Sequence, residues 1–280
     1  MAGRSARGAR RVHGRPRSQH FLRSPRLAAA IVGDASVRPG ELVLDLGAGS
    51  GRLTAPLANA GAEVRAVELD PVRAARLRDR FRGAPNVEVI EDDVLRVPIP
   101  ARPFRIVANL PFHLTTAILH RLLDDPRVPL ARADVLVEWE VARKRARRWP
   151  STLLNVVWGV RYELDVVRRL PAACFEPRPD ADAGLLRIVR RSEPLVLDGE
   201  VDAFRALVEA GFRGGGSLRA ALGARAPGGV FKRTGRELGF DPSASARDLD
   251  CYQWAGLFRA ATISRGATRA QSGGDRARSA

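Results

Sequence analysis

The sequence predicts an α/β fold, with an open, mostly parallel sheet that has helices on both faces and is followed by a small all-helical domain. Between Glu41 and residue 191, short apolar runs alternate with segments of helical periodicity, which is typical of repeated strand–helix units. After Pro194, helical segments follow one another with no strand pattern between them. The predicted divisions are an Arg-rich flexible N-terminal tail at 1–17, the sheet domain at 18–192, the helical domain at 193–263 and a disordered basic tail at 264–280.

Short apolar runs carry the predicted strands. The first, "LVLDL" at 42–46, has the length of a buried parallel strand and a Gly-rich exit. The others lie at 63–69, 87–92, 104–109, 133–140, 162–170 and 184–191, and we expect the last two to form an antiparallel pair. Helices are predicted at 51–61, 71–81, 115–123, directly after 140, and at 198–212, 217–226, 230–238 and 251–261. Pro71 suits a first helical turn, and Thr115 or Thr116 is the predicted cap of its helix.

The composition is that of an ordinary globular protein, with 45% apolar residues among 280. No apolar run approaches the length of a membrane span, and the N-terminus lacks the apolar region of a secretory signal. Cys174 and Cys251 form no paired motif, so we expect reduced thiols in a cytoplasmic protein. The four histidines show no metal-ligand spacing, and no metal site is predicted.

The net charge of +16 predicts a polyanionic partner, with nucleic acid favoured over an anionic membrane. The first 33 residues hold eight arginines and no acid, "RKRARR" at 143–148 has five cations in six positions, and the last twenty residues are again Arg-rich. Any one of these runs is consistent with a solvated face, whereas three on one chain favour RNA or DNA. The predicted RNA contacts adjoin the folded domain: Arg143, Lys144, Arg145, Arg147 and Arg148.

A glycine-rich turn follows the first strand. In "DLGAGSG", Gly47, Gly49 and Gly51 stand at the start of a helix, where the backbone can approach a ligand closely. The G-x-G-x-G spacing differs from the G-x-G-x-x-G of dinucleotide folds. Asp45 before the turn would repel a pyrophosphate and suits a cationic ligand, which disfavours a nicotinamide dehydrogenase.

Acidic residues end the next two strands. Glu68 stands where a carboxylate accepts hydrogen bonds from ribose hydroxyls, and Asp93 is placed to accept a bond from an adenine amino group. Either acid alone is consistent with a simple strand-end cap. A ligand with a ribose, a positive charge and no pyrophosphate is S-adenosylmethionine, which is therefore the predicted cofactor.

The stretch "ANLPFH" at 108–113 follows the fourth strand. Alone, it is consistent with an ordinary turn in which Asn109 caps, Pro111 ends the strand and Phe112 folds back into the core. As the fourth motif in an ordered set at strand ends, it is instead predicted to be the reaction centre. His113 receives no role.

Together, these motifs resemble the rRNA adenine N6-methyltransferases, a superfamily built on a Rossmann-like class I S-adenosylmethionine-dependent methyltransferase sheet. "SQHFL" at 18–22 resembles the N-terminal cofactor motif, usually Gln-Asn-Phe-Leu, and "DLGAGSG", "VELD" and "EDDVL" are similar to the next three motifs. "NLPF" resembles the catalytic motif, and "FEPRPDADAGLL" at 175–186 resembles the later Phe-x-Pro-x-Pro segment. The likeness runs from about Ser18 to Ala260.

The resemblance implies a role for each matching residue. The implied cofactor contacts are Gln19, His20, Leu22, Gly47, Gly49, Glu68, Asp93 and Asn109. His20 stands where the family commonly has Asn, and a neutral imidazole still donates one hydrogen bond. The implied catalytic residues are Asn109, Leu110, Pro111 and Phe112, and the rings implied beside the target base are Phe21, Phe112 and Phe175.

Within the superfamily, the chain most resembles the Erm methyltransferases of 23S rRNA, which confer macrolide–lincosamide–streptogramin B resistance. "EWEVARKRARR" and "DLDCYQWAGLF" (248–258) resemble Erm segments, and the Arg-rich tails resemble those of Erm proteins from macrolide-producing actinomycetes. The sister branch, which methylates two adjacent adenines of 16S rRNA during small-subunit assembly, stays as the alternative. The implied substrate is 23S rRNA, naked or in an assembling large subunit, and the implied enzyme is a monomer.

The implied reaction is methyl transfer to N6 of one adenine in the peptidyl-transferase loop. The Asn109 side-chain oxygen and the Leu110 carbonyl would accept the amine hydrogens, Pro111 would fix the turn and Phe112 would stack on the base. A rival hypothesis is an RNA-binding assembly or transcription factor without the chemistry, which the intact "NLPF" argues against. A DNA adenine methylase would carry an Asp-Pro-Pro-Tyr-type motif instead.

Overall fold

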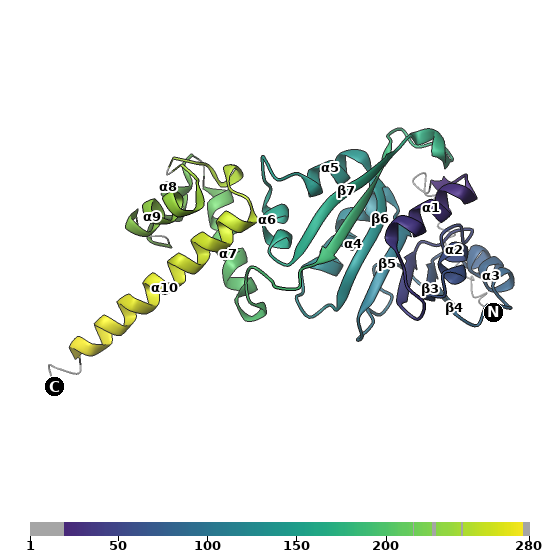
Figure 1. The fold of residues 1–280 in the computed structure, drawn as a ribbon, viewed down its shortest axis with the longest axis horizontal. Helices are drawn as coiled ribbons and strands as arrows, with labels where there is room; N and C mark the ends of the chain where they lie inside the picture. Colours follow the sequence, from purple (N-terminus) through teal and green to yellow (C-terminus); the bar gives the residue numbers. More distant parts are fainter. Residues whose placement is uncertain (1–19, 215, 226–227, 242, 277–280) are drawn as a thin grey trace, which may run out of the picture.

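The computed structural model describes residues 20–214, 216–225, 228–241 and 243–276, with side chains described up to residue 263 except at 224 and 228. The molecule is elongated: the sheet occupies one end and a group of helices the other (Figure 1). The predicted N-terminal tail at 1–17 and Gln19 lie outside the described residues.

A seven-stranded sheet has the order β4-β3-β2-β5-β6-β9-β7. The first five strands of this order are parallel, and β9 is antiparallel to β7, as predicted, and also to β6. The strands are β2 (Leu42–Leu46), β3 (Glu63–Glu68), β4 (Val87–Glu91), β5 (Phe104–Asn109), β6 (Leu130–Glu138), β7 (Tyr162–Leu170) and β9 (Ala183–Arg190).

The strand order reverses at β2, which pairs with β3 on one side and with β5 on the other. All five residues of β2 are buried because helices cover both faces of the sheet. In sheets of this kind, ligands bind beyond the carboxyl ends of the strands at such a reversal. The ends of β2, β3, β4 and β5 therefore mark the edge where a site is expected.

The helices of the sheet region divide between two apolar layers. One layer buries α1 (Pro25–Ala35) and α2 (Thr54–Asn59) against one face, and the other buries α4 (Thr115–Leu123) and α6 (Leu153–Gly159) against the opposite face. Side-chain caps begin three of these helices: Ser24 accepts from the Leu27 amide in α1, Asp70 from the Val72 and Arg73 amides in α3 (Pro71–Arg80), and Thr152 from the Asn155 amide in α6.

The C-terminal region is helical, with α7 (Val201–Arg213), α8 (Leu218–Leu222), α9 (Gly228–Leu238) and α10 (Cys251–Arg276). Its apolar core is continuous with that of the sheet, since Trp158, Phe204 and Trp254 belong to one buried cluster. No helix in the described part of the chain is long and apolar enough to span a membrane.

The structure corrects several boundaries. β6 ends at Glu138 and α5 (Trp139–Ala146) begins immediately, so the predicted strand to 140 is two residues too long. Neither threonine caps α4: Leu114 is the N-cap residue, and the Thr115 hydroxyl donates to the Pro111 carbonyl. The backbone at 264–276, predicted to be disordered, continues α10. The prediction also missed α1 and a two-stranded sheet that pairs β1 (Phe21–Leu22) with β8 (Phe175–Glu176).

Candidate active site

The glycine turn joins β2 to α2 at the carboxyl edge of the sheet. Gly47 and Gly49 have φ angles of +77° and +58°. Residues other than glycine rarely adopt this left-handed backbone conformation. The Gly47 amide donates to the Val67 carbonyl at 2.8 Å, which ties the turn to β3. A Cβ atom on Gly49 would lie 2.5 Å from the ring of Phe21. Glycine is therefore required both by the backbone and by the ring packed against it.

Glu68 ends β3 and is 1% exposed. One carboxylate oxygen accepts from the Gly49 amide at 2.8 Å, and the other accepts from the Asp70 amide at 3.0 Å. An ionised carboxylate offers about four acceptor positions, so Glu68 holds the turn and keeps capacity for a ligand hydroxyl. Leu69, the next residue, is 62% exposed and gives this edge an apolar surface that the sequence analysis did not single out.

Asp45 is buried beneath the same turn and accepts a hydrogen bond from the Thr54 hydroxyl at 2.7 Å. Burial, with the nearby charge of Glu68, raises the pKa of the Asp45 carboxyl to about 7 against the opposing effect of the Thr54 bond. Asp93 lies just beyond β4 and accepts from the Leu95 amide at 2.8 Å, so it caps a turn at the position expected for an adenine contact.

Asn109 ends β5 and has a fixed amide group. Its nitrogen donates to the His20 carbonyl at 2.5 Å, whereas its side-chain oxygen is buried and has no partner among the described residues. The Leu110 amide donates to the Leu136 carbonyl at 3.1 Å, which anchors the loop to β6. A Cβ atom on Gly47 would lie 3.7 Å from the Pro111 ring, so this proline is close to the glycine turn. The end of β5 is thus fixed by several contacts, while the Asn109 side-chain oxygen remains available to accept a hydrogen bond.

A small cavity brings several predicted residues together. Leu22, Asp45, Gly47 and Asn109 all line it, and the ring of Phe21 forms part of its wall. The cavity therefore joins the glycine turn to the loop at the end of β5. Asp93 does not line it and stands further along the edge, after β4.

His20 and two phenylalanines form an aromatic group beside Asn109. The His20 ring donates to the Pro177 carbonyl through Nδ1 at 2.8 Å and lies 5.6 Å from the Phe112 ring. Phe175 packs edge-on against Phe112 at 6.5 Å. Phe175 is only 1% exposed, so in this structure its ring supports Phe112.

The basic run at 143–148 is not one surface. Arg145 is buried and stacks over Trp158 at 5.3 Å, and burial lowers the pKa of its guanidinium. This burial leaves Arg145 little surface for the predicted contact with RNA. Arg143 pairs with Glu140 at 3.0 Å and Arg148 with Asp250 at 3.4 Å, while both keep more than half of their side-chain surface exposed.

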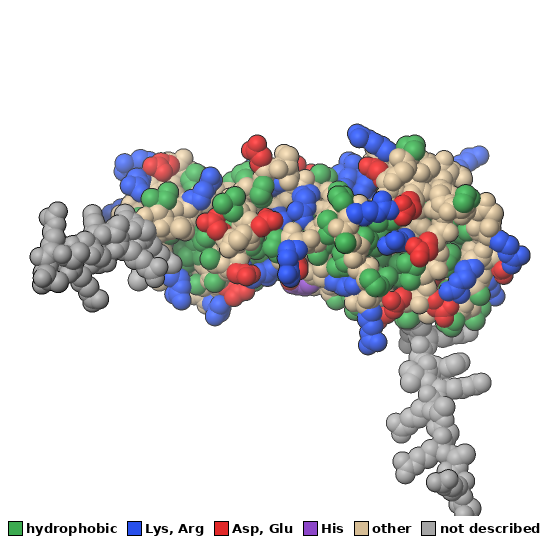
Figure 2. All heavy atoms as spheres, turned by 90° about the horizontal axis from the view of Figure 1, so that it is seen from below, with side chains coloured by type: hydrophobic (Ala, Val, Ile, Leu, Met, Phe, Trp, Pro, Cys, Tyr) green, Lys and Arg blue, Asp and Glu red, His purple; other side chains and the backbone are tan. Residues whose placement is uncertain are grey.

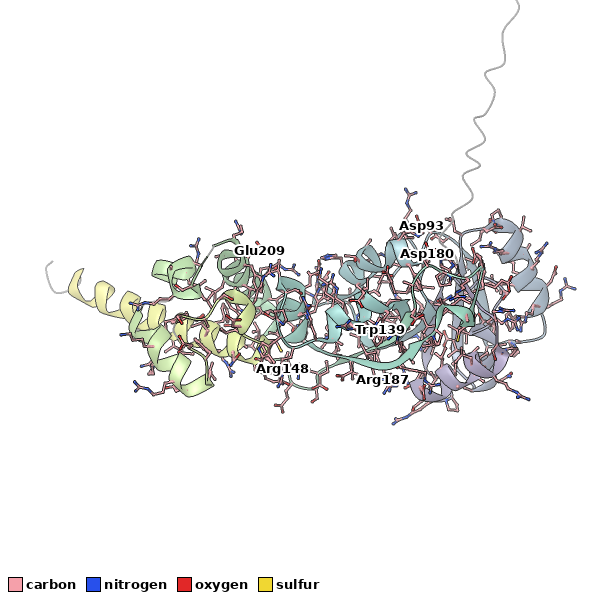
Figure 3. The ribbon with its side chains drawn as sticks, turned by 90° about the horizontal axis from the view of Figure 1, so that it is seen from above. Asp93, Trp139, Arg148, Asp180, Arg187 and Glu209 are labelled. Carbon is pink, nitrogen blue, oxygen red and sulfur yellow. The ribbon has the colours of Figure 1, made fainter. Side chains whose placement is uncertain are left out.

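The remaining positive charge is spread over the molecule. Basic side chains lie along the length of the face shown in Figure 2, interspersed with acidic ones. In Figure 3, Arg148 lies towards the helical end of the molecule, while Asp93 lies at the sheet end. An RNA that touches both places must therefore extend along the molecule.

Comparison with known proteins assigns the chain to a family. The profile of the ribosomal RNA adenine dimethylases matches residues 15–261. The chain belongs to this family. It is 38% identical over 242 residues to the mycinamicin-resistance protein MyrB of Micromonospora griseorubida, with 86% of this chain and 76% of MyrB covered. It is 31% identical over 255 residues to ribosomal RNA small subunit methyltransferase A of a Synechococcus species, with 85% and 89% covered.

Among solved structures, the 23S rRNA methyltransferase ErmE matches with a TM-score of 0.79 and 31% identity, covering 86% of this chain and 99% of that one. As a member of the rRNA adenine dimethylase family, the chain has the S-adenosylmethionine-dependent methyltransferase fold, with rRNA as its partner. The strand-end residues fit this cofactor. The buried carboxyl groups of Asp45 and Glu68 suit a cationic ligand, and the glycines of the turn allow a ligand to approach the backbone.

Proposed function

We propose that the protein transfers a methyl group from S-adenosylmethionine to N6 of one adenine in the peptidyl-transferase loop of 23S rRNA, and so confers macrolide-type resistance. The observation that carries this proposal is the Asn109 amide, fixed through its nitrogen and left with a buried oxygen that has no partner among the described residues. A buried acceptor of this kind is costly unless a ligand donates to it. The two N6 hydrogens of adenine are suitable donors.

The cofactor supplies an electrophilic methyl group on a sulfonium. Glu68 would accept from its ribose hydroxyls, Asp93 from its adenine amino group, and the backbone of Gly47 and Gly49 would lie against it. Ionised Asp45 would favour the positive charge from beneath the turn. Gln19 is also proposed as a contact, on the resemblance of its motif alone.

At the target base, Asn109 and the Leu110 carbonyl would accept hydrogen bonds from the N6 amine. The nitrogen lone pair, otherwise delocalised into the ring, would then become available for in-line attack. Pro111 would fix the Leu110 carbonyl in place. No strong general base is needed, because the proton becomes acidic only as the new bond forms.

Phe112 would stack on the adenine after it leaves the RNA stack. Stacking is worth about 1–3 kcal/mol per base, comparable to the few kcal/mol needed to unstack it. His20 and Phe175 support the Phe112 ring from two directions. His20 would therefore act on the site by positioning Asn109 and Phe112, in addition to its proposed cofactor contact.

The exposed cations of the basic run, Arg143, Lys144, Arg147 and Arg148, would hold the RNA backbone. We propose that a monomer acts in the cytoplasm on naked 23S rRNA or on an assembling large subunit. The identity to MyrB, 38%, exceeds the 31% identity to the small subunit enzyme only modestly, so 16S rRNA is the alternative substrate.

Primer extension on 23S rRNA, after expression in a macrolide-sensitive host, tests the proposal. We expect a new stop at one adenine of the peptidyl-transferase loop, together with macrolide resistance. A stop near the 3′ end of 16S rRNA would replace the proposal with its alternative. Cofactor binding without a stop in either RNA would favour a non-catalytic RNA-binding factor.

A further inference from the structure

A cavity of about 470 Å³ adjoins the candidate active site, and Phe21, Leu22 and Arg52 line both this cavity and the small one beside Asn109. Three elements bound it: the glycine turn, the first strand β1 with its partner β8, and helix α3. Arginines and a few apolar side chains make up most of its lining. Its volume lies within the range of sites for small ligands.

One face of α3 supplies most of the basic wall. Arg73, Arg76, Leu77 and Arg80 follow the i, i+3, i+4, i+7 spacing that places side chains on one side of a helix. The Arg80 guanidinium also donates to the Ser50 carbonyl, which joins this wall to the glycine turn.

The charge of the cavity is strongly unbalanced. Five arginines line it against one acid, Glu176, which pairs with Arg23 at 3.5 Å. Within the described part of the chain, Arg52 and Arg76 have no acidic side chain within ion-pair distance. A guanidinium group without an acidic partner is suited to a phosphate, which it can bind with two parallel hydrogen bonds.

The floor of the cavity is apolar. Phe21, Leu22 and Leu77 form it, and the Arg73 guanidinium lies 4.8 Å from the centre of the Phe21 ring. An aromatic ring beside arginines is the combination by which proteins bind single-stranded nucleotides, with the ring against the base and the cations on the backbone.

The cofactor does not explain this cavity. S-adenosylmethionine is cationic and carries no phosphate, so five arginines would repel it. The proposed cofactor residues Glu68, Asp93 and Asn109 do not line the cavity, although Leu22 and Gly49 lie on the border between it and their site. The occupant must be anionic and partly planar.

We propose that this cavity binds a nucleotide of the RNA substrate that neighbours the target adenine, with its base against Phe21 and its phosphate on Arg52 and Arg76. The inference rests on the proposed function, because it takes the same RNA as ligand. It also gives Phe21 a different role from stacking on the target base. The cavity adjoins the reaction centre through His20, whose carbonyl holds the Asn109 amide and whose neighbour in the chain is Phe21.

Crosslinking tests where the RNA lies. A photoreactive group is attached to Arg76→Cys and, as control, to Arg82→Cys, which lies just beyond α3, is largely exposed and does not line the cavity. The probe is a hairpin that carries the peptidyl-transferase loop. We expect the group at position 76 to crosslink within a few nucleotides of the methylated adenine and the group at position 82 not to do so. Equal crosslinking at both positions, or none at 76, would overturn the inference.

Binding measurements complete the test with charge-matched variants. Arg76→Glu and Arg82→Glu change the net charge equally, so only a local contact separates them. We expect Arg76→Glu to bind the hairpin, and a single-stranded oligoadenylate, about tenfold more weakly than Arg82→Glu, with a salt dependence reduced by about one phosphate contact. Calorimetry with S-adenosylmethionine should show unchanged cofactor affinity for both.

The outcomes separate the two proposals. If the wild-type protein leaves the hairpin unmethylated while Arg76→Glu still weakens oligoadenylate binding, the 23S function fails and the nucleotide site stands. If methylation is intact and the two variants bind RNA alike, the nucleotide site fails. Loss of cofactor affinity in Arg76→Glu alone would assign the cavity to the cofactor and also overturn the inference.

Discussion

The carboxyl edge of the sheet and the basic run at 143–148 use their residues in opposite ways. At the edge, the polar side chains are held by specific hydrogen bonds: Glu68 holds the glycine turn and the Asn109 nitrogen is held by His20. In the run, neighbouring cations have different surroundings. One is buried against a tryptophan ring, two form ion pairs and the others face solvent. Groups that perform chemistry need fixed geometry, whereas groups that attract a polyanion need only exposed charge.

The substitution Asn109→Ala gives the strongest test of this difference between the two regions. Methyl transfer should fall by a factor of about 10² to 10³ or more, because one acceptor at the reacting nitrogen is lost, while RNA affinity stays nearly unchanged. Incorporation of labelled methyl groups and filter binding measure the two effects. The matched control is Asn86→Ala, whose amide bonds the Ala58 and Ala62 carbonyls away from the site. Undiminished transfer by the Asn109 variant would refute the mechanism.

Phe112→Ala separates stacking from amine activation. Removal of the ring should lower kcat/KM by the equivalent of about 1–3 kcal/mol, while Phe112→Tyr keeps most of the activity. Steady-state kinetics with the rRNA hairpin give the values. A Phe112→Ala enzyme as active as the Tyr variant would show that the ring does not contact the base.

Arg145→Ala and Arg147→Ala test the division within the basic run. Arg145 is buried against Trp158, so its loss should lower the free energy of unfolding by about 1–3 kcal/mol. Arg147 is exposed, so its loss should change stability by less than about 0.5 kcal/mol and reduce the salt dependence of RNA binding. Urea unfolding and salt titrations provide the data, and the reverse assignment of the two effects would contradict the structure.

A modest effect is expected in the pH dependence of cofactor binding. The pKa of Asp45 is raised to about 7, so its carboxyl gains its charge as the pH rises through that value. Affinity for the cationic cofactor should therefore increase by at most about tenfold between pH 6 and pH 8. Calorimetry at several pH values measures it, and Asp45→Asn should abolish the increase and lower the affinity at pH 8.

The same carboxyl predicts how stability changes with pH. The folded state keeps a proton that the unfolded chain releases near the ordinary value of 3.8, so the Asp45 contribution to stability declines as the pH rises from there to about 7. In Asp45→Asn this part of the decline should be absent. Thermal melts at pH 5 and pH 8 check it, and parallel changes in the two proteins would exclude Asp45 as the cause.

Much of the fold followed from local patterns. The strands at 42–46 and 104–109 have the predicted bounds because a short apolar run with a glycine or asparagine exit leaves few alternatives. The strand predicted at 133–140 ran two residues too far, because Trp139 has strand propensity and only tertiary packing places it in α5. The pairing of β1 with β8 was missed because two-residue strands have no periodicity to detect.

The sequence by itself determined the order of the strand-end motifs and the need for glycine, carboxylate and amide at their positions, because these requirements are local to each turn. Only the tertiary structure decided which groups meet. His20 holds Asn109 across 89 residues, Phe175 is buried behind Phe112, and Arg145 turns inward while its neighbours face solvent. The cavity beneath the arginines of α3 likewise needs three separate elements. Contacts between distant segments depend on packing of the whole chain, which no local pattern encodes.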